Sequence, residues 1–170
     1  TARKWDTVRR AGIDADHSPA VVVNAAEGEP GSFKDRLLIR RDPYRVLEGA
    51  CIAARAVGGN RVIVALKEGS TVEARRLADA AAEFGEAGWA PGIAIEVFTG
   101  PREYLLGEET ALLEAVDGRP PFPRVTPPYR RGIDEETIDL RDPDRTAARA
   151  ELAGPNDTTV AAPTLVDNVE

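Results

Sequence analysis

The chain has 170 residues, a formal net charge of -7 and a hydrophobic fraction of 42%. This length suffices for one domain with its own core, and the acidic balance argues against a surface for nucleic acid or anionic membranes, since such surfaces need clustered Lys and Arg. No apolar run approaches the roughly 20 residues of a membrane-spanning helix and no signal peptide opens the chain, so we expect a cytoplasmic protein without direct membrane insertion.

Two features of the composition limit the chemistry. Cys51 is the single cysteine and lies in an alanine-rich helical pattern, so it excludes an internal disulfide and is expected to be a small buried residue. The chain contains no methionine. We therefore expect residues 1–170 to form one core domain that is a piece of a longer subunit.

The first strand and the turn after it organise the chain. Residues 20–23 form a valine run typical of a buried strand, and residues 27–31 (EGEPG) continue neither a strand nor a helix. Ser32 and Asp35 form a weak capping pattern for a short helix through Ile39.

The next helix and strand have clearer boundaries. Asp42 is the expected N-cap and Pro43 the first helical residue, and the apolar period of 3.6 continues to Val57 before Gly58-Gly59. Residues 61–66 (RVIVAL) predict a second buried strand.

A third strand follows another helix. Ser70 and Glu73 predict a capping box for an alanine-rich helix that reaches Glu86, and residues 93–98 alternate as in a strand with one wetter face. The order strand, helix, strand, helix, strand predicts an α/β fold, a Rossmann-like three-layer domain with a mostly parallel sheet and right-handed crossovers.

The second half of the chain is less regular. A helix is expected over residues 107–116, and residues 119–131 hold five prolines and predict a stiff extended loop. Residues 133–159 are charged and lack an apolar period, so we expect a surface insertion with a short helix near 146–152. Residues 163–169 predict a return strand or loop.

The acidic turn is the first candidate site. Ligands bind beyond the carboxyl ends of strands in open α/β sheets, so Glu27 and Glu29 are expected to border a pocket, although a solvated acidic turn is the alternative. A divalent metal is the weaker hypothesis because no histidine cluster accompanies the glutamates. Ser32 lacks a histidine partner, and His17, the only histidine, lies in a polar loop.

Two motifs carry a family resemblance. Residues 24–36 (NAAEGEPGSFKDR) and residues 104–113 (YLLGEETALL) resemble two flavin-site motifs of the NADH-oxidising, FMN-carrying subunit of respiratory NADH:quinone oxidoreductase and of its diaphorase relatives. The similarity runs from residue 1 to about residue 131 and resumes at 163–170. It implies a flavoprotein that takes a hydride from NADH onto FMN and passes electrons to an iron-sulfur cluster outside this chain, so that this piece alone is expected to be inactive.

The resemblance also assigns residues. It places these at the FMN: Lys4, Asn24, Glu27, Tyr104, Gly107, Glu108, Glu109 and Asn168. It places Glu29 and Tyr129 at the bound NAD, the first as a hydrogen-bond acceptor and the second against the adenine. It implies no catalytic acid or base, no metal ligand in this chain, and partners that are other subunits of an electron-transfer complex, peripheral to a membrane.

Three positions depart from the family pattern. Ala26 stands where aspartate is usual, Thr126 where a lysine near the nicotinamide nucleotide is expected, and Asp167 where the first of two asparagines is typical. These departures leave two alternatives open, a non-catalytic assembly module and a flavoprotein that exchanges electrons with ferredoxin. Carboxylates in the first turn of a helix are also favoured by its dipole, so Glu108 and Glu109 have a purely structural alternative.

Overall fold

The computed structural model describes residues 2–134 and 161–170. Its elements in chain order are α1 (Ala2–Ala15), β1 (Ala20–Ala25), α2 (Lys34–Arg41), α3 (Pro43–Val57), β2 (Arg61–Lys67), α4 (Thr71–Glu86), β3 (Ala94–Gly100), the 3-10 turn η1 (Tyr104–Gly107), α5 (Glu109–Val116), β4 (Ile133–Asp134), β5 (Ala161–Ala162) and β6 (Thr164–Asn168). Apart from β4, the predicted insertion at 133–159 and its helix at 146–152 lie outside the described residues.

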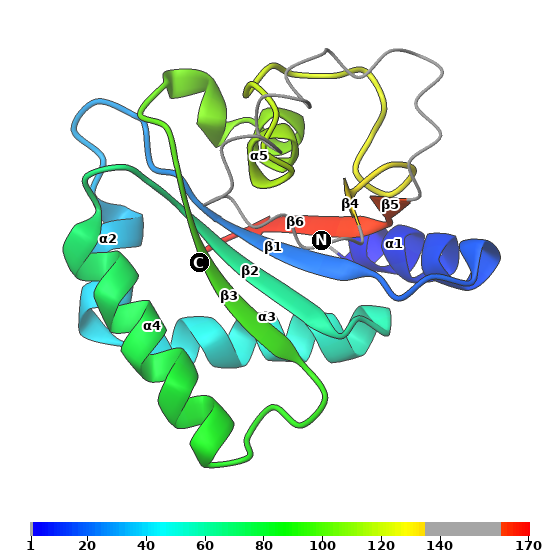
Figure 1. The fold of residues 1–170 in the computed structure, drawn as a ribbon, viewed down its shortest axis with the longest axis horizontal. Helices are drawn as coiled ribbons and strands as arrows, with labels where there is room; N and C mark the ends of the chain where they lie inside the picture. The colour runs from blue at the N-terminus through cyan, green and yellow to red at the C-terminus, as the bar shows by residue number, and fades with distance from the viewer. Residues whose placement is uncertain (1, 135–160) are drawn as a thin grey trace.

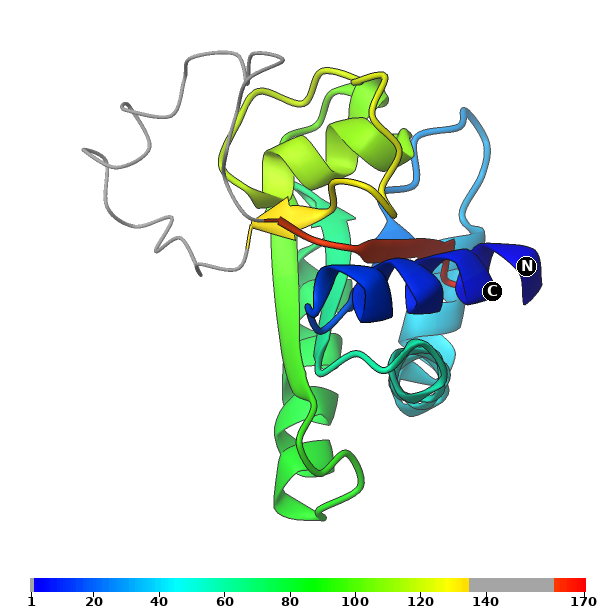
Figure 2. The same ribbon diagram turned by 90° about the vertical axis from the view of Figure 1, so that its right-hand side faces the viewer.

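The strands β1, β2, β3 and β6 form one parallel sheet in the order β3-β2-β1-β6. The connections that advance from β1 to β3 carry α2, α3 and α4 on one face, and the return to β6 carries α5 on the other face (Figures 1 and 2). Crossovers of one hand require this change of face when the direction reverses. The predicted three-layer α/β architecture is confirmed, with β4 and β5 as a separate antiparallel pair.

The valine run of β1 supplies both halves of the core because successive side chains of a strand point to opposite faces. Val21 and Val23 pack with α1 to α4, whereas Ala20 and Val22 pack with α5 and η1. Cys51 is buried in the first of these clusters, as predicted.

One helix begins and ends as the sequence predicts. The Asp42 carboxylate accepts a hydrogen bond from the Arg45 N–H at the start of α3, and Gly58 ends the helix with a φ of 79°. A Cβ at Gly59 would lie 2.4 Å from the carbonyl oxygen of Pro19, so the second glycine permits a close approach of two backbones.

The hydrogen bonds predicted for two helix caps are absent. The Ser32 hydroxyl donates to Glu27 instead of capping α2, whose N-cap position is Phe33. Ser70 is the N-cap residue of α4, as predicted, but its side chain makes no cap hydrogen bond, and Glu73 is buried in an ion pair with Arg40. The Ser32 hydroxyl thus bonds within the acidic turn, whereas the Glu73 carboxylate bonds to a residue 33 positions away.

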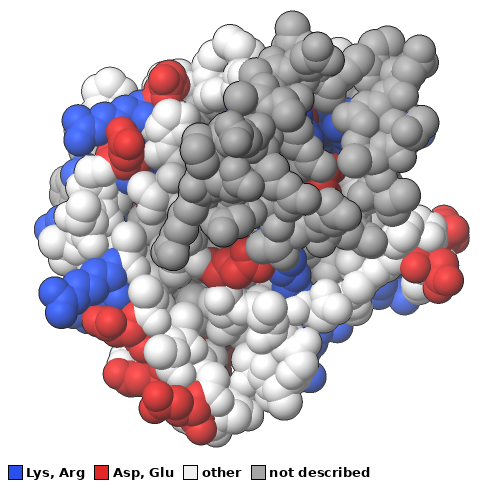
Figure 3. Space-filling model, in the orientation of Figure 1, with Lys and Arg blue, Asp and Glu red and all other residues white. Residues whose placement is uncertain are grey.

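Side chains of both charges lie side by side on one face of the molecule (Figure 3). On the face shown in Figure 3, Lys and Arg are interleaved with Asp and Glu, and acidic side chains gather over α4. That face offers no broad basic patch of the kind that nucleic acids need. Among the described helices, none is long and apolar enough to cross a membrane.

Candidate functional site

The site lies at the carboxyl edge of the sheet. The chain adds β2 and β3 on one side of β1 and then returns to place β6 on the other, so the strand order reverses between β1 and β6. In open α/β sheets this reversal leaves a crevice that binds ligands. Asn24 and Asn168 are register partners at the ends of these two strands, which brings two predicted flavin residues to the crevice.

The two motifs meet at this edge. The Asn24 side-chain amide donates to the Gly107 carbonyl over 2.9 Å, across 83 positions of sequence. The Tyr104 hydroxyl donates to the Glu29 carboxylate over 2.6 Å. A Cβ at Gly107 would lie 3.4 Å from the Ala26 carbonyl oxygen, so the backbones also approach closely. The acidic turn and the start of the later helix therefore meet at this edge of the sheet.

Glu27 organises the acidic turn itself. Its carboxylate accepts hydrogen bonds from the Ser32 hydroxyl at 2.7 Å, the Asp35 N–H at 3.3 Å and the Arg36 guanidinium at 3.1 Å. Its side chain is 6% exposed. Burial opposes ionisation, but the hydrogen bonds from Ser32 and Arg36 outweigh it and lower the pKa of Glu27. The carboxylate thus remains charged and fixes the turn, while Glu29 faces Tyr104.

Glu108 is the N-cap of α5. Its carboxylate accepts from the Thr110 N–H at 2.9 Å, the Ala111 N–H at 2.8 Å and the Thr110 hydroxyl at 2.6 Å. Burial opposes ionisation, and these hydrogen bonds nevertheless lower the pKa of Glu108. These contacts support the purely structural alternative for Glu108, and its place at FMN remains a prediction.

Lys4 joins α1 to the other side of the crevice. Its ammonium donates to the Glu109 carboxylate and to the Val166 carbonyl, and it lies 3.9 Å from an Asp167 carboxylate oxygen. The second oxygen of Asp167 accepts from the Trp5 indole N–H over 2.7 Å. The aspartate that departs from the family pattern therefore has a cation and a donor as partners.

Tyr129 belongs to a different environment. It is half-buried and packs at the margin of the core cluster formed by α1 to α4 and their face of the sheet. Among the described residues no hydrogen bond joins it to the acidic turn, and its place against an adenine is a prediction. Thr126, in the same loop, is exposed.

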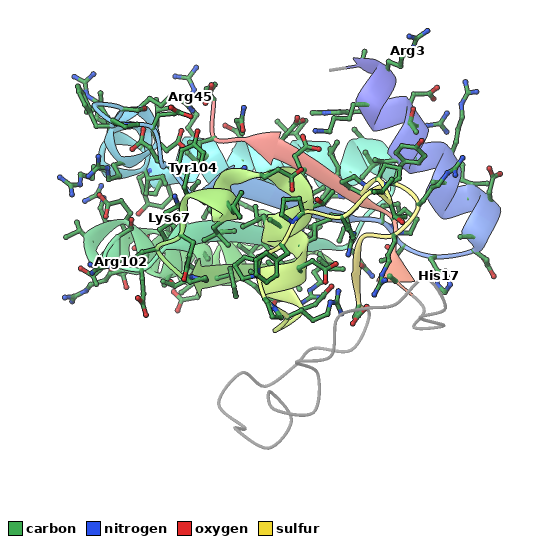
Figure 4. All side chains as sticks on the ribbon, turned by 90° about the horizontal axis from the view of Figure 1, so that it is seen from above. Arg3, His17, Arg45, Lys67, Arg102 and Tyr104 are labelled. Atoms are coloured by element: carbon green, nitrogen blue, oxygen red, sulfur yellow. The ribbon has the colours of Figure 1, made fainter. Side chains whose placement is uncertain are left out.

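Sequence reasoning missed Lys67, the last residue of β2. The residue is 9% exposed, and its ammonium lies 5.8 Å from the centroid of the Tyr104 ring. Burial lowers its pKa, against the opposing charges of Glu103 and Glu29. Figure 4 shows Lys67 and Tyr104 near one another at the end of the molecule opposite His17. A cation that ends an apolar strand at the carboxyl edge was the signal that the sequence offered.

The comparisons with known proteins decide the family. The family described as "Nuo51 FMN-binding domain" matches residues 1–169. The chain belongs to this family. It is 36% identical over 138 residues to an NADH-quinone oxidoreductase subunit of Rhizobium meliloti, covering 76% of the chain and 32% of the relative. It is 35% identical over 139 residues to the mitochondrial NADH-ubiquinone oxidoreductase 51 kDa subunit of Neurospora crassa, covering 76% of the chain and 28% of that relative.

Solved structures agree with the family. An NAD+-reducing [NiFe]-hydrogenase in the H2-reduced state superposes with a TM-score of 0.77 at 32% identity, over 99% of this chain and 25% of that one. Its air-oxidised state gives a TM-score of 0.72 at 30% identity, over 99% of this chain and 24% of that one. The chain therefore spans less than one third of the length of these relatives, and the resemblance seen in the two motifs is confirmed.

The side chains at the crevice fit part of an FMN. An isoalloxazine ring presents carbonyl oxygens and an N–H along one edge, and an asparagine amide both donates and accepts. Asn168 is exposed at the end of β6, with no hydrogen bond to its side chain among the described residues, and Lys4 adds a cation beside it. Tyr104 offers an exposed aromatic ring held by Glu29. In the described ranges, no group of three His, Cys, Asp or Glu side chains is arranged to hold a metal.

Proposed function

We propose that this chain is the FMN-binding core of an NADH dehydrogenase-type flavoprotein subunit. In this proposal the whole protein takes a hydride from NADH onto FMN and passes electrons to an iron-sulfur cluster held outside this chain. The observation that carries the proposal is the pair of contacts Asn24 to Gly107 and Glu29 to Tyr104, which gather both motifs at one edge of the sheet.

The residues of this chain act as positioners in that reaction. When bound, FMN supplies the chemistry that takes up an electron pair as hydride and gives electrons up singly. Hydride transfer requires the two rings to be held at van der Waals distance, and no acid or base is needed at the nicotinamide. We assign Asn24, Asn168 and Lys4 to the polar rim of the flavin. Glu29 accepts hydrogen bonds from hydroxyl groups of the dinucleotide, a charge-assisted contact.

The partners follow from the assemblies that the relatives' names describe. Those relatives are subunits of NADH-quinone oxidoreductases, and the structural neighbours are NAD+-reducing hydrogenases. We propose that this chain likewise works beside other subunits of an electron-transfer complex, in the cytoplasm and at most peripheral to a membrane. The net charge of -7 favours a partner subunit whose docking surface carries Lys and Arg.

The test uses the full-length protein. We expect it to purify with FMN and to reduce an artificial dye when NADH is added. A matched variant, Asn24→Ala, removes the hydrogen bond to Gly107 and should lower the retained FMN and the dye reduction together, because the amide joins the two motifs. A full-length protein that is colourless and inert after FMN is supplied would refute the proposal.

The assembly module is the second candidate, and Ala26 and Thr126 are the observations that favour it. The double substitution Ala26→Asp and Thr126→Lys restores the family's residues at both positions. A protein that uses NADH should keep or increase its dye reduction. A scaffold should gain nothing from the change and should bind its partner subunits equally well in both forms. Reduction of the bound flavin by ferredoxin but not by NADH would favour the third alternative.

A further inference from the structure

Lys67 lies at the carboxyl edge of the sheet and has no role in the function proposed above. Apolar residues from Val62 to Leu66 precede it in β2, and their side chains alternate between the two core clusters. Lys67 continues this alternation and points to the face that carries η1 and α5. It is 9% exposed, which is unusual for a lysine without a paired acid.

The ammonium of Lys67 has no anionic partner at contact distance in the part of the chain that the structure describes. By contrast, Lys4 pairs with Glu109, and Lys34 pairs with Asp35 at 2.7 Å. The contact recorded for Lys67 is with the face of the Tyr104 ring. A desolvated ammonium satisfied by one aromatic face retains N–H donors for an additional acceptor.

The acidic turn leaves room for this ammonium. A Cβ at Gly28 would lie 2.5 Å from Lys67 Nζ, so the absence of a side chain at Gly28 permits the lysine to reach the turn. Lys67 and Glu29 thereby contact the same side chain, Tyr104, from its ring face and its hydroxyl. A ligand that carries both a negative charge and hydroxyl groups matches this pair of a cation and a carboxylate on one ring.

We propose that Lys67 binds a phosphate of the dinucleotide diphosphate while Glu29 binds its ribose hydroxyls. This assignment rests on the proposed use of NADH and extends it to a residue outside both motifs. A phosphate needs a cation or a backbone cradle, and Thr126, at the position where the family has a lysine, supplies no charge. Lys67 supplies the cation from the sheet edge, and Tyr104 fixes the spacing between the two contacts.

The test measures the binding of ADP-ribose to the full-length protein by calorimetry. ADP-ribose carries the diphosphate and ribose but no nicotinamide, so its binding needs no hydride transfer. Lys67→Met should weaken its binding about ten- to hundredfold, as expected for loss of a charge-assisted hydrogen bond, and Lys67→Arg should retain most of the affinity. Arg75→Met removes the same charge from an exposed site on α4 and should leave the affinity unchanged.

A second variant separates direct contact from general charge. Gly28→Ala keeps every charge but displaces the far end of the flexible lysine side chain, so the fold should tolerate it. We expect Gly28→Ala to weaken ADP-ribose binding as well. Thermal melting of each variant checks that it is folded, and Gly28→Ala keeps the proposal testable if Lys67→Met does not fold.

Two results would overturn the proposal. The first is unchanged ADP-ribose affinity in folded Lys67→Met. The second is an equal loss of affinity for reduced nicotinamide riboside, which lacks phosphate. FMN content and flavin reduction are measured separately on the same preparations. A change in ADP-ribose affinity can therefore be distinguished from a loss of flavin. A wild-type protein that lacks FMN would instead count against the proposed function.

Discussion

Asp117 provides the sharpest prediction about stability. The residue follows α5, is 3% exposed, and accepts hydrogen bonds from Arg119 at 2.5 Å and from the Asp134 N–H at 2.9 Å. Burial, and after it the nearby charge of Asp134, raise the pKa of Asp117 from its ordinary value of 3.8 to about 6. The folded protein therefore binds a proton at Asp117 more tightly than the unfolded chain does.

The sign of the pH effect follows from this difference. Between pH 7 and pH 5 the folded state takes up a proton that the unfolded state does not, so this residue makes the free energy of unfolding rise as the pH falls. A folded pKa of about 6 against 3.8 gives a gain of about 1 kcal/mol over that interval. Asp117→Asn removes the titration and should abolish the gain.

The assay is urea denaturation of the wild type and Asp117→Asn at pH 5, 6 and 7. Comparing the two proteins cancels the contributions of the other carboxylates. Asp79→Asn, at an exposed position of α4, makes the same chemical change away from the buried cluster and should keep the wild-type pH dependence. Identical pH dependence in the wild type and Asp117→Asn would refute the reasoning.

Three further predictions test other contacts. Arg119→Met leaves buried carboxylates without their cation and should lower the free energy of unfolding by about 3 to 5 kcal/mol in urea titration at pH 7; a loss below about 1 kcal/mol would contradict this. Glu27→Gln should cost about 1 to 3 kcal/mol at pH 7. Because the folded pKa of Glu27 is lowered, the difference from wild type should shrink as the pH falls below 4.5; a cost that stays constant through the whole acid titration would argue against it. Gly132→Ala places a Cβ 2.0 Å from the Ala162 carbonyl oxygen and should cost about 1 to 3 kcal/mol in thermal melts. Gly49→Ala, with nothing within 4 Å of its Cβ, should instead stabilise α3. Equal melting temperatures of Gly132→Ala and Gly49→Ala would contradict the packing.

The strands were predictable because their signal is local. The valine run of β1 and the run from Arg61 to Leu66 identified central strands, and parallel pairing then placed their carboxyl ends at one edge. Because β3 runs parallel to them, the segment after it reaches the same edge, where Tyr104 and Gly107 meet the acidic turn. The family motifs supplied the residues, and the sheet supplied their proximity.

Other features depended on contacts between distant segments. Glu73 matched a local capping box, yet Arg40, 33 positions away, holds its carboxylate. Likewise the charge of Arg119 gave no sign that it would be buried among three acids, because burial depends on how the proline-rich loop folds back over α5. The position of Lys67 at the end of β2 was visible in the sequence, but its burial depends on contacts with Gly28 and Tyr104, which are distant in the sequence.

Anaerobic mixing of the FMN-loaded full-length protein with one equivalent of NADH tests the central claim most directly. Hydride transfer at the crevice predicts stoichiometric loss of the oxidised flavin absorbance as NADH is consumed, and a slower or smaller loss in Asn24→Ala. An oxidised flavin that persists in excess NADH would contradict the account.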